Sequence, residues 1–360
     1  MTKPNFPQDI VEEILLRSPV KALFRFKSVS KPWRSLISSS SFAKLHFQRA
    51  SEDRSIKAQN VLLSSPNDGL KFFKVSDTSL GDELALVGLD FPPKGRIQCS
   101  KILGSCNGLV ALALNNFFFI WNPSTGDYKK LGEPSPSALA HPYQRFSGFG
   151  YDSSSDDYKL FFGFSPKKAE IFSLRKNSWR MIEIFPPLDV YYTKGCGVFV
   201  NGALHWPFQC YMPYDKEITA FDVNREIFNR LPIPHGAIYQ IGLGVLEDKL
   251  CINYRILSAI EFWVMEDYGS KGSWIKLFSI RYLGFLEPLC ISETTVLFIN
   301  EGRSKKLMRC DAEEDNFKIF QVFNNPKWPC EGIAYIESLL SPNFYCNVSV
   351  DETHNDHIVN

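Results

Sequence analysis

Few residues of this 360-residue chain have the types and spacing that chemistry requires. Gly104-Ser105-Cys106-Asn107-Gly108 has the form of a nucleophile elbow with a cysteine as the attacking residue. That reading needs a strand before the cysteine, a helix after it and a histidine within reach. A strand-like apolar run follows instead, so the segment is predicted to be a turn entering a strand.

The other candidates are histidines and acidic residues. His205 stands beside Trp206 in a predicted strand, where a histidine is more often packed than catalytic. His354 and His357 are spaced for one helix face, but no helical pattern surrounds them and two histidines make a poor metal site. The Ser and Asp residues at 153–157 favour a solvated loop over a cation site. The sequence therefore predicts no catalytic residue, no cofactor and no metal.

Composition is typical of a globular protein. Apolar residues make up 44% of the chain and charged residues 22%. The longest apolar run, 109–121, holds two asparagines and is too short for a membrane helix. Nine cysteines without a CxxC pair, and acidic residues near the N-terminus in place of a signal peptide, predict a reducing compartment, cytoplasm or nucleus.

The net charge is divided unevenly. Residues 1–50 hold nine Lys or Arg against three Asp or Glu, and the remainder holds 31 against 36. A basic segment can indicate nucleic-acid binding. Here the cations stand singly among apolar residues, and no aromatic platform accompanies them. An acidic protein partner is therefore the better prediction, with no nucleic acid and no membrane.

Residues 6–47 predict three or four short amphipathic helices. Pro7 opens the first, and Ile10, Ile14 and Leu15 recur at the spacing of one helix face. About forty residues rarely hold a stable core alone, so this segment is expected to be stabilised by a partner. The apolar residues of the next two helices are Val20, Leu23, Phe24, Trp33, Leu36 and Ile37.

This segment resembles an F-box, the module by which substrate receptors dock onto the Skp-type adaptor of Skp/cullin/F-box ubiquitin ligases. Pro7 matches the proline of the family's opening Leu-Pro, and Ile14-Leu15 matches its central apolar pair. Pro19 matches its second proline, and Val29 to Trp33 its Val-Ser-Lys-x-Trp signature. Two residues depart from the pattern by replacing a leucine: Phe6 and Ser18.

The resemblance implies a set of adaptor-binding residues. Trp33 is the predicted hot spot, because truncating a buried interface aromatic typically costs about 2 kcal/mol or more. The alternative is that Trp33 belongs to the helical segment's own core. The full set is Phe6, Pro7, Ile10, Ile14, Leu15, Pro19, Leu23, Val29, Trp33 and Leu36.

After residue 60 the helical period is replaced by short apolar runs separated by Gly, Asn and Pro, which is typical of an all-β domain. A pattern with a period near 47 recurs, in which an apolar residue is followed seven positions later by another. Each copy follows a predicted strand pair, with Asn201-Gly202 as the strongest turn signal. The copies are Trp121–Tyr128, Phe172–Trp179, Phe221–Phe228, Cys310–Phe317 and, with four extra residues, Trp263–Trp274.

Four strands per 40 to 50 residues predict the blades of a β-propeller. About six four-stranded blades fit between residues 60 and 341, the first around Leu70 to Val75. The alternative, a pair of β-sandwiches, has no reason to repeat at this interval. The predicted division is an all-α segment at 1–48, a linker at 49–59, the all-β propeller at 60–341 and a loose tail at 342–360.

The all-β region resembles the F-box-associated domain found behind plant F-boxes, which is kelch-like in layout. It is not a standard kelch protein, because the sequence contains no Gly-Gly pair. The matching segments are GSCNGL at 104–109, WNPSTG at 121–126, GFGYD at 148–152, NGALHW at 201–206 and YIESL at 335–339.

Together the two resemblances imply a substrate receptor. The N-terminal segment would bind the adaptor and through it a cullin scaffold, while propeller loops hold a target protein for ubiquitination by proximity, without a catalytic side chain. Loop tyrosines that could anchor the target are Tyr143, Tyr191 and Tyr192. Two alternatives are a propeller enzyme using groups in the central channel, and a scaffold that binds the adaptor without supporting ubiquitin transfer.

Overall fold

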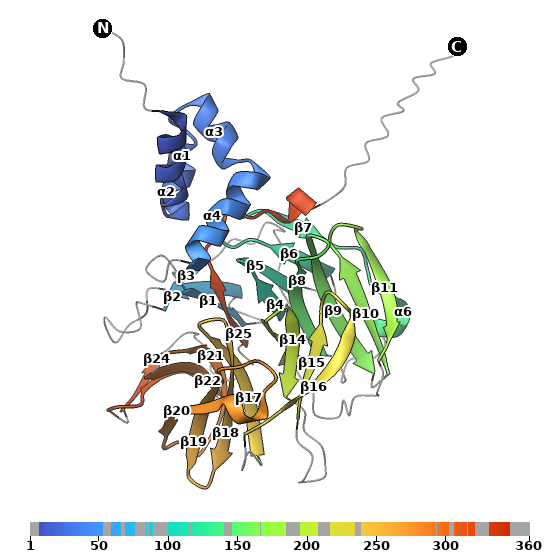
Figure 1. The fold of residues 1–360 in the computed structure, drawn as a ribbon, viewed down its shortest axis with the longest axis vertical. Helices are drawn as coiled ribbons and strands as arrows, with labels where there is room; N and C mark the ends of the chain where they lie inside the picture. The colour runs from blue at the N-terminus through green and yellow to red at the C-terminus, as the bar shows by residue number, and fades with distance from the viewer. Residues whose placement is uncertain are drawn as a thin grey trace.

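The computed structural model begins with four helices, and strands make up most of the rest (Figure 1). The helices are α1 (Gln8–Leu16), α2 (Val20–Phe26), α3 (Lys31–Ile37) and α4 (Ser40–Glu52). The last helix therefore continues into the segment 49–59 that the sequence analysis assigned to a linker. The structure describes residues 7–52, 59–65, 69–75, 84, 86–88, 100–114, 117–139, 146–165, 167–184, 195–207, 217–234, 239–292, 294–301, 306–314, 316–320 and 331–345.

Prolines and a serine set where the first three helices begin. Pro7 and Pro19 precede α1 and α2, and the Ser30 hydroxyl accepts a hydrogen bond from the Trp33 N–H at 3.3 Å to cap α3. The predicted helices are thus confirmed. One apolar stripe from each helix meets in a small core made of Leu15, Val20, Leu23, Ile37, Phe42 and Ala43.

Two polar contacts tie α4 to the first helices. The His46 ring places Nε2 2.9 Å from the Ser18 carbonyl oxygen, at the corner between α1 and α2. Burial lowers the pKa of His46, because a charged imidazolium would lose its hydration there. Arg49 forms an ion pair with Glu13 on α1.

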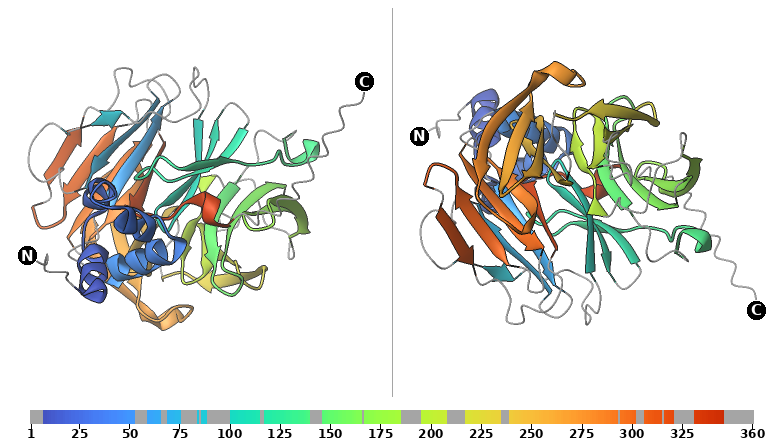
Figure 2. Two further views of the ribbon diagram at one scale, coloured as in Figure 1. Left: turned by 90° about the horizontal axis from the view of Figure 1, so that it is seen from above. Right: turned by 90° about the horizontal axis from the view of Figure 1, so that it is seen from below.

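The strands form six sheets arranged around an axis as propeller blades (Figures 1 and 2). Innermost strand first, blade 1 is β25 (Glu331–Ile336), β1 (Gln59–Ser65), β2 (Gly69–Lys74) and β3 (Val87–Gly88), and blade 2 is β4 (Ser100–Cys106), β5 (Leu109–Leu114), β6 (Phe117–Trp121) and β7 (Tyr128–Lys130). Blade 3 is β8 (Phe146–Asp152), β9 (Asp157–Ser165), β10 (Lys168–Ser173) and β11 (Ser178–Glu183), and blade 4 is β13 (Val198–Val200), β14 (Ala203–Pro207), β15 (Glu217–Asp222) and β16 (Ile227–Pro232).

Blade 5 is β17 (Tyr239–Leu246), β18 (Lys249–Ile256), β19 (Ala259–Met265) and β20 (Trp274–Ile280), and blade 6 is β21 (Phe285–Ile291), β22 (Thr295–Glu301), β23 (Leu307–Asp311) and β24 (Asn316–Phe320). A two-residue strand, β12 (Gly195–Cys196), pairs in parallel with β8 before the chain enters blade 4. The short helices outside the sheets are α6 (Pro136–Leu139), η1 (Lys271–Ser273) and η2 (Pro342–Tyr345).

The seven-residue pattern of the sequence is the turn between the third and fourth strands of a blade. Its two residues face each other across that hairpin in the four regular copies. In the longer copy the register shifts, so that Trp274 faces Met265 and Trp263 faces Lys276. The predicted six-bladed propeller is therefore confirmed. The four regular pairs are Trp121–Tyr128, Phe172–Trp179, Phe221–Phe228 and Cys310–Phe317.

The ring is closed by strands from both ends of the domain. β25 pairs antiparallel with β1, with Ala334 opposite Val61, and so supplies the innermost strand of blade 1. The weakly patterned segment Leu70 to Val75 lies largely in β2, the third strand of that blade. Closure pairs strand edges that an open sheet would expose.

Three of the family-like motifs meet where the ring closes. Asn122 is fully buried; its Oδ1 accepts a hydrogen bond from the Ser124 N–H at 2.7 Å, and its Nδ2 donates to the Ser338 carbonyl at 2.9 Å. Gly108 has φ +81°, and a Cβ there would stand 2.3 Å from Ser338 Oγ and 2.6 Å from the Ile336 carbonyl oxygen. The motifs are thus explained by close backbone approach at the closure.

Two other motifs meet between blades 3 and 4. A Cβ on Gly148 would lie 2.8 Å from Leu204, and one on Gly197 would lie 2.6 Å from the Trp206 ring. The Ser147 carbonyl accepts hydrogen bonds from the Gly197 N–H at 2.6 Å and from Trp206 Nε1 at 3.0 Å. The two glycines leave room for the Leu204 and Trp206 side chains of blade 4 to pack directly on the backbone.

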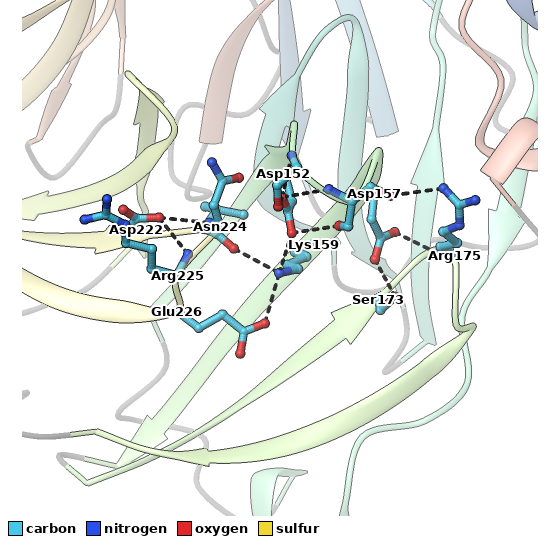
Figure 3. A network of polar contacts seen from close by, with 12 residues as sticks. Asp152, Asp157, Lys159, Ser173, Arg175, Asp222, Asn224, Arg225 and Glu226 are labelled. Carbon is cyan, nitrogen blue, oxygen red and sulfur yellow. Dashed lines mark hydrogen bonds and ion pairs between the residues drawn. The ribbon is translucent and has the colours of Figure 1, made fainter.

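A polar network joins the same two blades (Figure 3). The Lys159 ammonium contacts the Asp152 carboxylate at 2.8 Å and the Glu226 carboxylate at 3.0 Å, and it donates to the Val223 carbonyl at 2.9 Å. Burial alone would raise the pKa of Asp152, but the hydrogen bond from Lys159 and those from neighbouring serines outweigh burial and lower it. The network therefore holds the Asp152 carboxylate ionised.

The helical segment rests on blades 2 and 3 at one end of the ring. Lys44 on α4 forms an ion pair with Asp156 at 2.6 Å, and its ammonium lies 5.2 Å from the centre of the Tyr345 ring. Tyr345 packs edge-on against Tyr158, with ring centres 4.9 Å apart. The apolar cores of the two regions are continuous, because Phe42 belongs to the same cluster as the core of blades 2 and 3.

The start of the predicted tail is part of the fold. Pro342 and Tyr345 are buried in η2, so residues 342–345 are ordered against the ring and the loose-tail prediction is corrected for them. The physical reason is a long-range contact, because the Tyr345 ring packs against Tyr158 of blade 3. The polar residues around Tyr345 in the sequence do not reveal this contact. The rest of the predicted tail lies outside the described residues.

Candidate functional site

The predicted adaptor-binding residues fall into an exposed and a buried group. Ile10, Ile14 and Val29 are 49%, 56% and 62% exposed. Pro7 and Pro19 are also exposed. Ile10 and Ile14 lie one turn apart on α1, and Val29 lies in the turn between α2 and α3. The helices thus present apolar side chains that the described residues leave exposed.

The buried group belongs to the protein's own core. Leu15 and Leu23 have no exposed surface, so they support the apolar face and do not form it. Trp33 and Leu36 are half-buried, and the Trp33 ring packs edge-on against Phe26 with centres 5.8 Å apart. The role of Trp33 as a hot spot stays a prediction, because this tryptophan already packs within the helices as the alternative reading expected.

Most of the exposed charged residues between residues 7 and 37 are basic. Glu13 forms ion pairs with Arg17 at 2.8 Å and with Arg49, and hydrogen bonds from both arginines lower its pKa. The predicted acidic partner would meet a face rich in exposed cations. Its exposed cationic residues are Arg17, Lys21, Arg25, Lys31 and Arg34.

The inner strands enclose a second candidate site, a cavity of about 1140 Å³ along the ring axis. Phe47 and Ser51 of α4 contribute to its wall at the end where the helices lie over the ring (Figure 2, left). Cys106 also lines it. This cysteine stands between β4 and β5, not before a helix, and burial raises the pKa of its thiol. The segment is therefore a strand-to-strand turn and lacks the activation that a nucleophile needs.

His205 lines the same cavity as a packed residue. It is fully buried, with Nδ1 3.1 Å from the Val198 carbonyl oxygen and Nε2 2.6 Å from the Tyr268 hydroxyl. Burial lowers its pKa to about 4, so the imidazole is neutral near pH 7. Within the part of the chain that the structure describes, no group of three or more His, Cys, Asp or Glu side chains could hold a metal ion.

Four predicted site residues lie outside the described residues: Phe6, Tyr143, Tyr191 and Tyr192. Channel residues that sequence reasoning missed are Asn253, Glu287 and Glu331. Their strand positions become informative only when the blade register is known. Over the ranges that the structure describes, no helix is long and apolar enough to cross a membrane.

Comparison with known proteins agrees with this architecture. The F-box domain model matches residues 4–45, and the F-box associated beta propeller domain model matches residues 70–338. A helical F-box followed by a propeller defines an F-box protein of the substrate-receptor type. More particularly, this chain belongs to the family of F-box proteins that carry an F-box associated beta propeller domain.

Several Arabidopsis thaliana proteins resemble the chain over most of its length. The F-box/kelch-repeat protein At3g23880 is 28% identical over 94% of this chain and 96% of its own. The F-box protein CPR1 is 28% identical over 89% of this chain and 86% of its own. The F-box protein At4g22390 is 26% identical over 86% of this chain and 84% of its own. An F-box generally implies binding to a Skp-type adaptor.

Proposed function

We propose that this chain is the substrate-recognition subunit of a Skp/cullin/F-box ubiquitin ligase. Its F-box would dock onto the Skp-type adaptor, and its propeller would hold a target protein for ubiquitination. The observation that carries the proposal is the exposure of Ile10, Ile14 and Val29 on an F-box whose core is otherwise buried. Apolar side chains in such a group gain free energy when a partner removes them from water.

The contacts between the two regions support a mechanism based on proximity. Lys44, Tyr345 and the shared apolar core fix α4 against the ring. A target held by the propeller would then sit at a defined position relative to the adaptor, which raises the effective concentration of its lysines near the ubiquitin-charged enzyme. No side chain of this chain takes part in the transfer. We propose that it acts in the cytoplasm or nucleus.

Adaptor binding is the direct test. Ile14→Asp should weaken the affinity of the full chain for a purified Skp-type adaptor by about tenfold or more, because a charge would replace a desolvated interface side chain. Ile275→Asp is the matched control, since Ile275 is 53% exposed on the outer strand of blade 5, far along the chain from the F-box. Equal affinity of the two variants would reject the docking assignment.

Ubiquitin transfer requires a second experiment. Captured proteins should be identified after tandem affinity purification with the proteasome inhibited, and each candidate target then tested in a reconstituted ligase. Transfer to a target that depends on both the F-box and the propeller would support the proposal. Adaptor binding without any transfer would favour the scaffold alternative.

A further inference from the structure

The channel wall carries an excess of negative charge. Its described residues include four carboxylates, Glu247, Asp248, Glu287 and Glu331, against one ammonium, that of Lys101. Glu247 and Asp248 lie in the turn between β17 and β18, at the F-box end of the ring, whereas Glu287 and Glu331 lie on the inner strands of blades 6 and 1. A cavity with walls of one charge sign concentrates ions of the other sign.

Two of these carboxylates line the same cavity as one thiol and influence its pKa. Cys196, on β12, lines the channel, and its pKa is raised to about 12. Burial is the largest cause; Glu287 and Glu331 raise the pKa further, and Lys101 opposes them. The four groups come from different blades, so the fold brings them together in one stretch of the channel.

A buried polar group in the same wall has an unused hydrogen-bonding atom. Asn253 is 2% exposed, and its Oδ1 accepts no hydrogen bond from the described residues. Its side chain extends from β18 across the inner strand, because a Cβ on Gly242 would lie 2.4 Å from this oxygen. Both residues line the cavity. Buried amides normally find partners, so a polar ligand is the natural complement of Asn253.

The rest of the wall combines polar groups with apolar side chains. Ile241, Leu243 and Leu286 contribute side chains between the polar groups. A ligand that suits this wall combines a compact cationic head with a slender hydrocarbon stem. A metal ion is a poor fit, because the described residues provide no cluster of metal-binding side chains.

We propose that the propeller channel binds an ammonium or guanidinium group carried on an apolar chain, with Glu287 and Glu331 as its anionic partners and Asn253 Oδ1 as a hydrogen-bond acceptor. Two sources carry this chemistry: a free polyamine, or a Lys or Arg side chain of a bound protein. Only the second rests on the proposed function, since that protein would be the target.

Calorimetric titration of the full chain tests the proposal with two probes, spermidine and the acetylated, amidated tripeptide Ala-Lys-Ala. We expect saturable binding of at least one probe with one site per chain. The double variant Glu287→Gln, Glu331→Gln should bind about tenfold more weakly or worse, because charge-assisted hydrogen bonds are lost. Glu313→Gln is the matched control, on an exposed turn of blade 6, and should bind as the wild type does.

A second variant keeps the test valid if the double variant does not fold. Asn253→Leu keeps the number and branching of the side-chain heavy atoms and removes both polar atoms, including the Oδ1 that has no partner. We expect its melting temperature to stay the same or rise while probe affinity falls, a combination that a purely structural asparagine would not give.

The outcomes assign the ligand source and remain separate from the ligase proposal. Binding of spermidine alone identifies a free polyamine, and binding of the peptide alone or of both admits a protein side chain. No saturable binding, or equal affinity in wild type and channel variants, overturns the proposal. Adaptor affinity, measured on the same variants, should be unchanged and reports on the F-box alone.

Discussion

The F-box and the propeller differ in how completely they bury their large apolar side chains. The ring buries large aromatic side chains such as Trp121, Trp206 and Tyr254 and closes its own edge by pairing β25 with β1. The F-box has a small core and leaves Ile10 and Ile14 largely in water. The propeller thus buries its apolar side chains within the chain, and from the exposed isoleucines we infer that the F-box is shaped to bind a second protein.

The largest effect should come from the F-box core. Leu15→Ala should lower the free energy of unfolding of the F-box by about 3 to 4 kcal/mol, because it leaves a cavity in a small core. Ile14→Ala, the next residue, should change it by about 0.5 kcal/mol or less while weakening adaptor binding. Hydrogen exchange of the helices measures the first quantity. Equal destabilisation by both variants would contradict the division into core and interface.

The propeller should lose stability in acid through a buried histidine. Unfolded His205 takes up a proton below about pH 6.5, but folded His205 stays neutral down to about pH 4. The contribution is fully present above pH 6.5 and is lost as the pH falls towards 4, by about 3 kcal/mol in total. Denaturant unfolding of wild type and His205→Gln from pH 7.5 to 4 measures it. A variant with an unchanged pH slope would refute the assignment.

The F-box should also lose stability as the pH falls, because burial lowers the pKa of His46 as well. His46→Gln should flatten the acid dependence of helix protection in hydrogen exchange and leave that of the ring unchanged. The pair of variants therefore separates the two regions by their pH response.

Ring closure can be tested with two glycines of matched backbone conformation. Gly108 and Gly126 have φ +81° and +82°, but only a Cβ on Gly108 would meet other atoms within 4 Å, those of Ser338 and Ile336. Gly126→Ala should cost about 1 kcal/mol of left-handed strain. Gly108→Ala should cost about 2 kcal/mol more through overpacking. Similar thermal unfolding of the two variants would show that the closure is looser than the structure indicates.

The smallest effect should come from the ion pair between the regions. Both side chains of Lys44 and Asp156 are more than a third exposed, so solvent screens their attraction. Lys44→Met should lower stability by less than about 1 kcal/mol, since the apolar junction remains. A larger loss in thermal unfolding would mean that the regions are joined mainly by charge.

The repeat was predictable because it has a local cause. A residue and its cross-strand partner seven positions later span a single hairpin, so Phe221 and Phe228 reveal a blade without any knowledge of the ring. The helices were equally predictable from the prolines that precede them and from the spacing of their apolar residues. These features depend on contacts within a few tens of residues.

What the sequence could not reveal depends on distant contacts. Ile14 and Leu15 are adjacent apolar residues, and only the packing of the helices decides that Leu15 is buried and Ile14 is exposed. Asn253 reaches the channel because it is paired with Gly242 between β17 and β18. The sequence alone does not reveal this strand register. Tyr345 is ordered by a blade nearly two hundred residues earlier.

The pairing of β25 with β1 also determines when the ring can close during synthesis. During synthesis from the N-terminus, the first blade lacks its inner strand until residues 331–336 have been made. The F-box segment is synthesised long before that point, so a nascent chain carries it beside an unfinished ring. A molecule cut short before β25 would keep the F-box sequence but lack the strand that closes the ring.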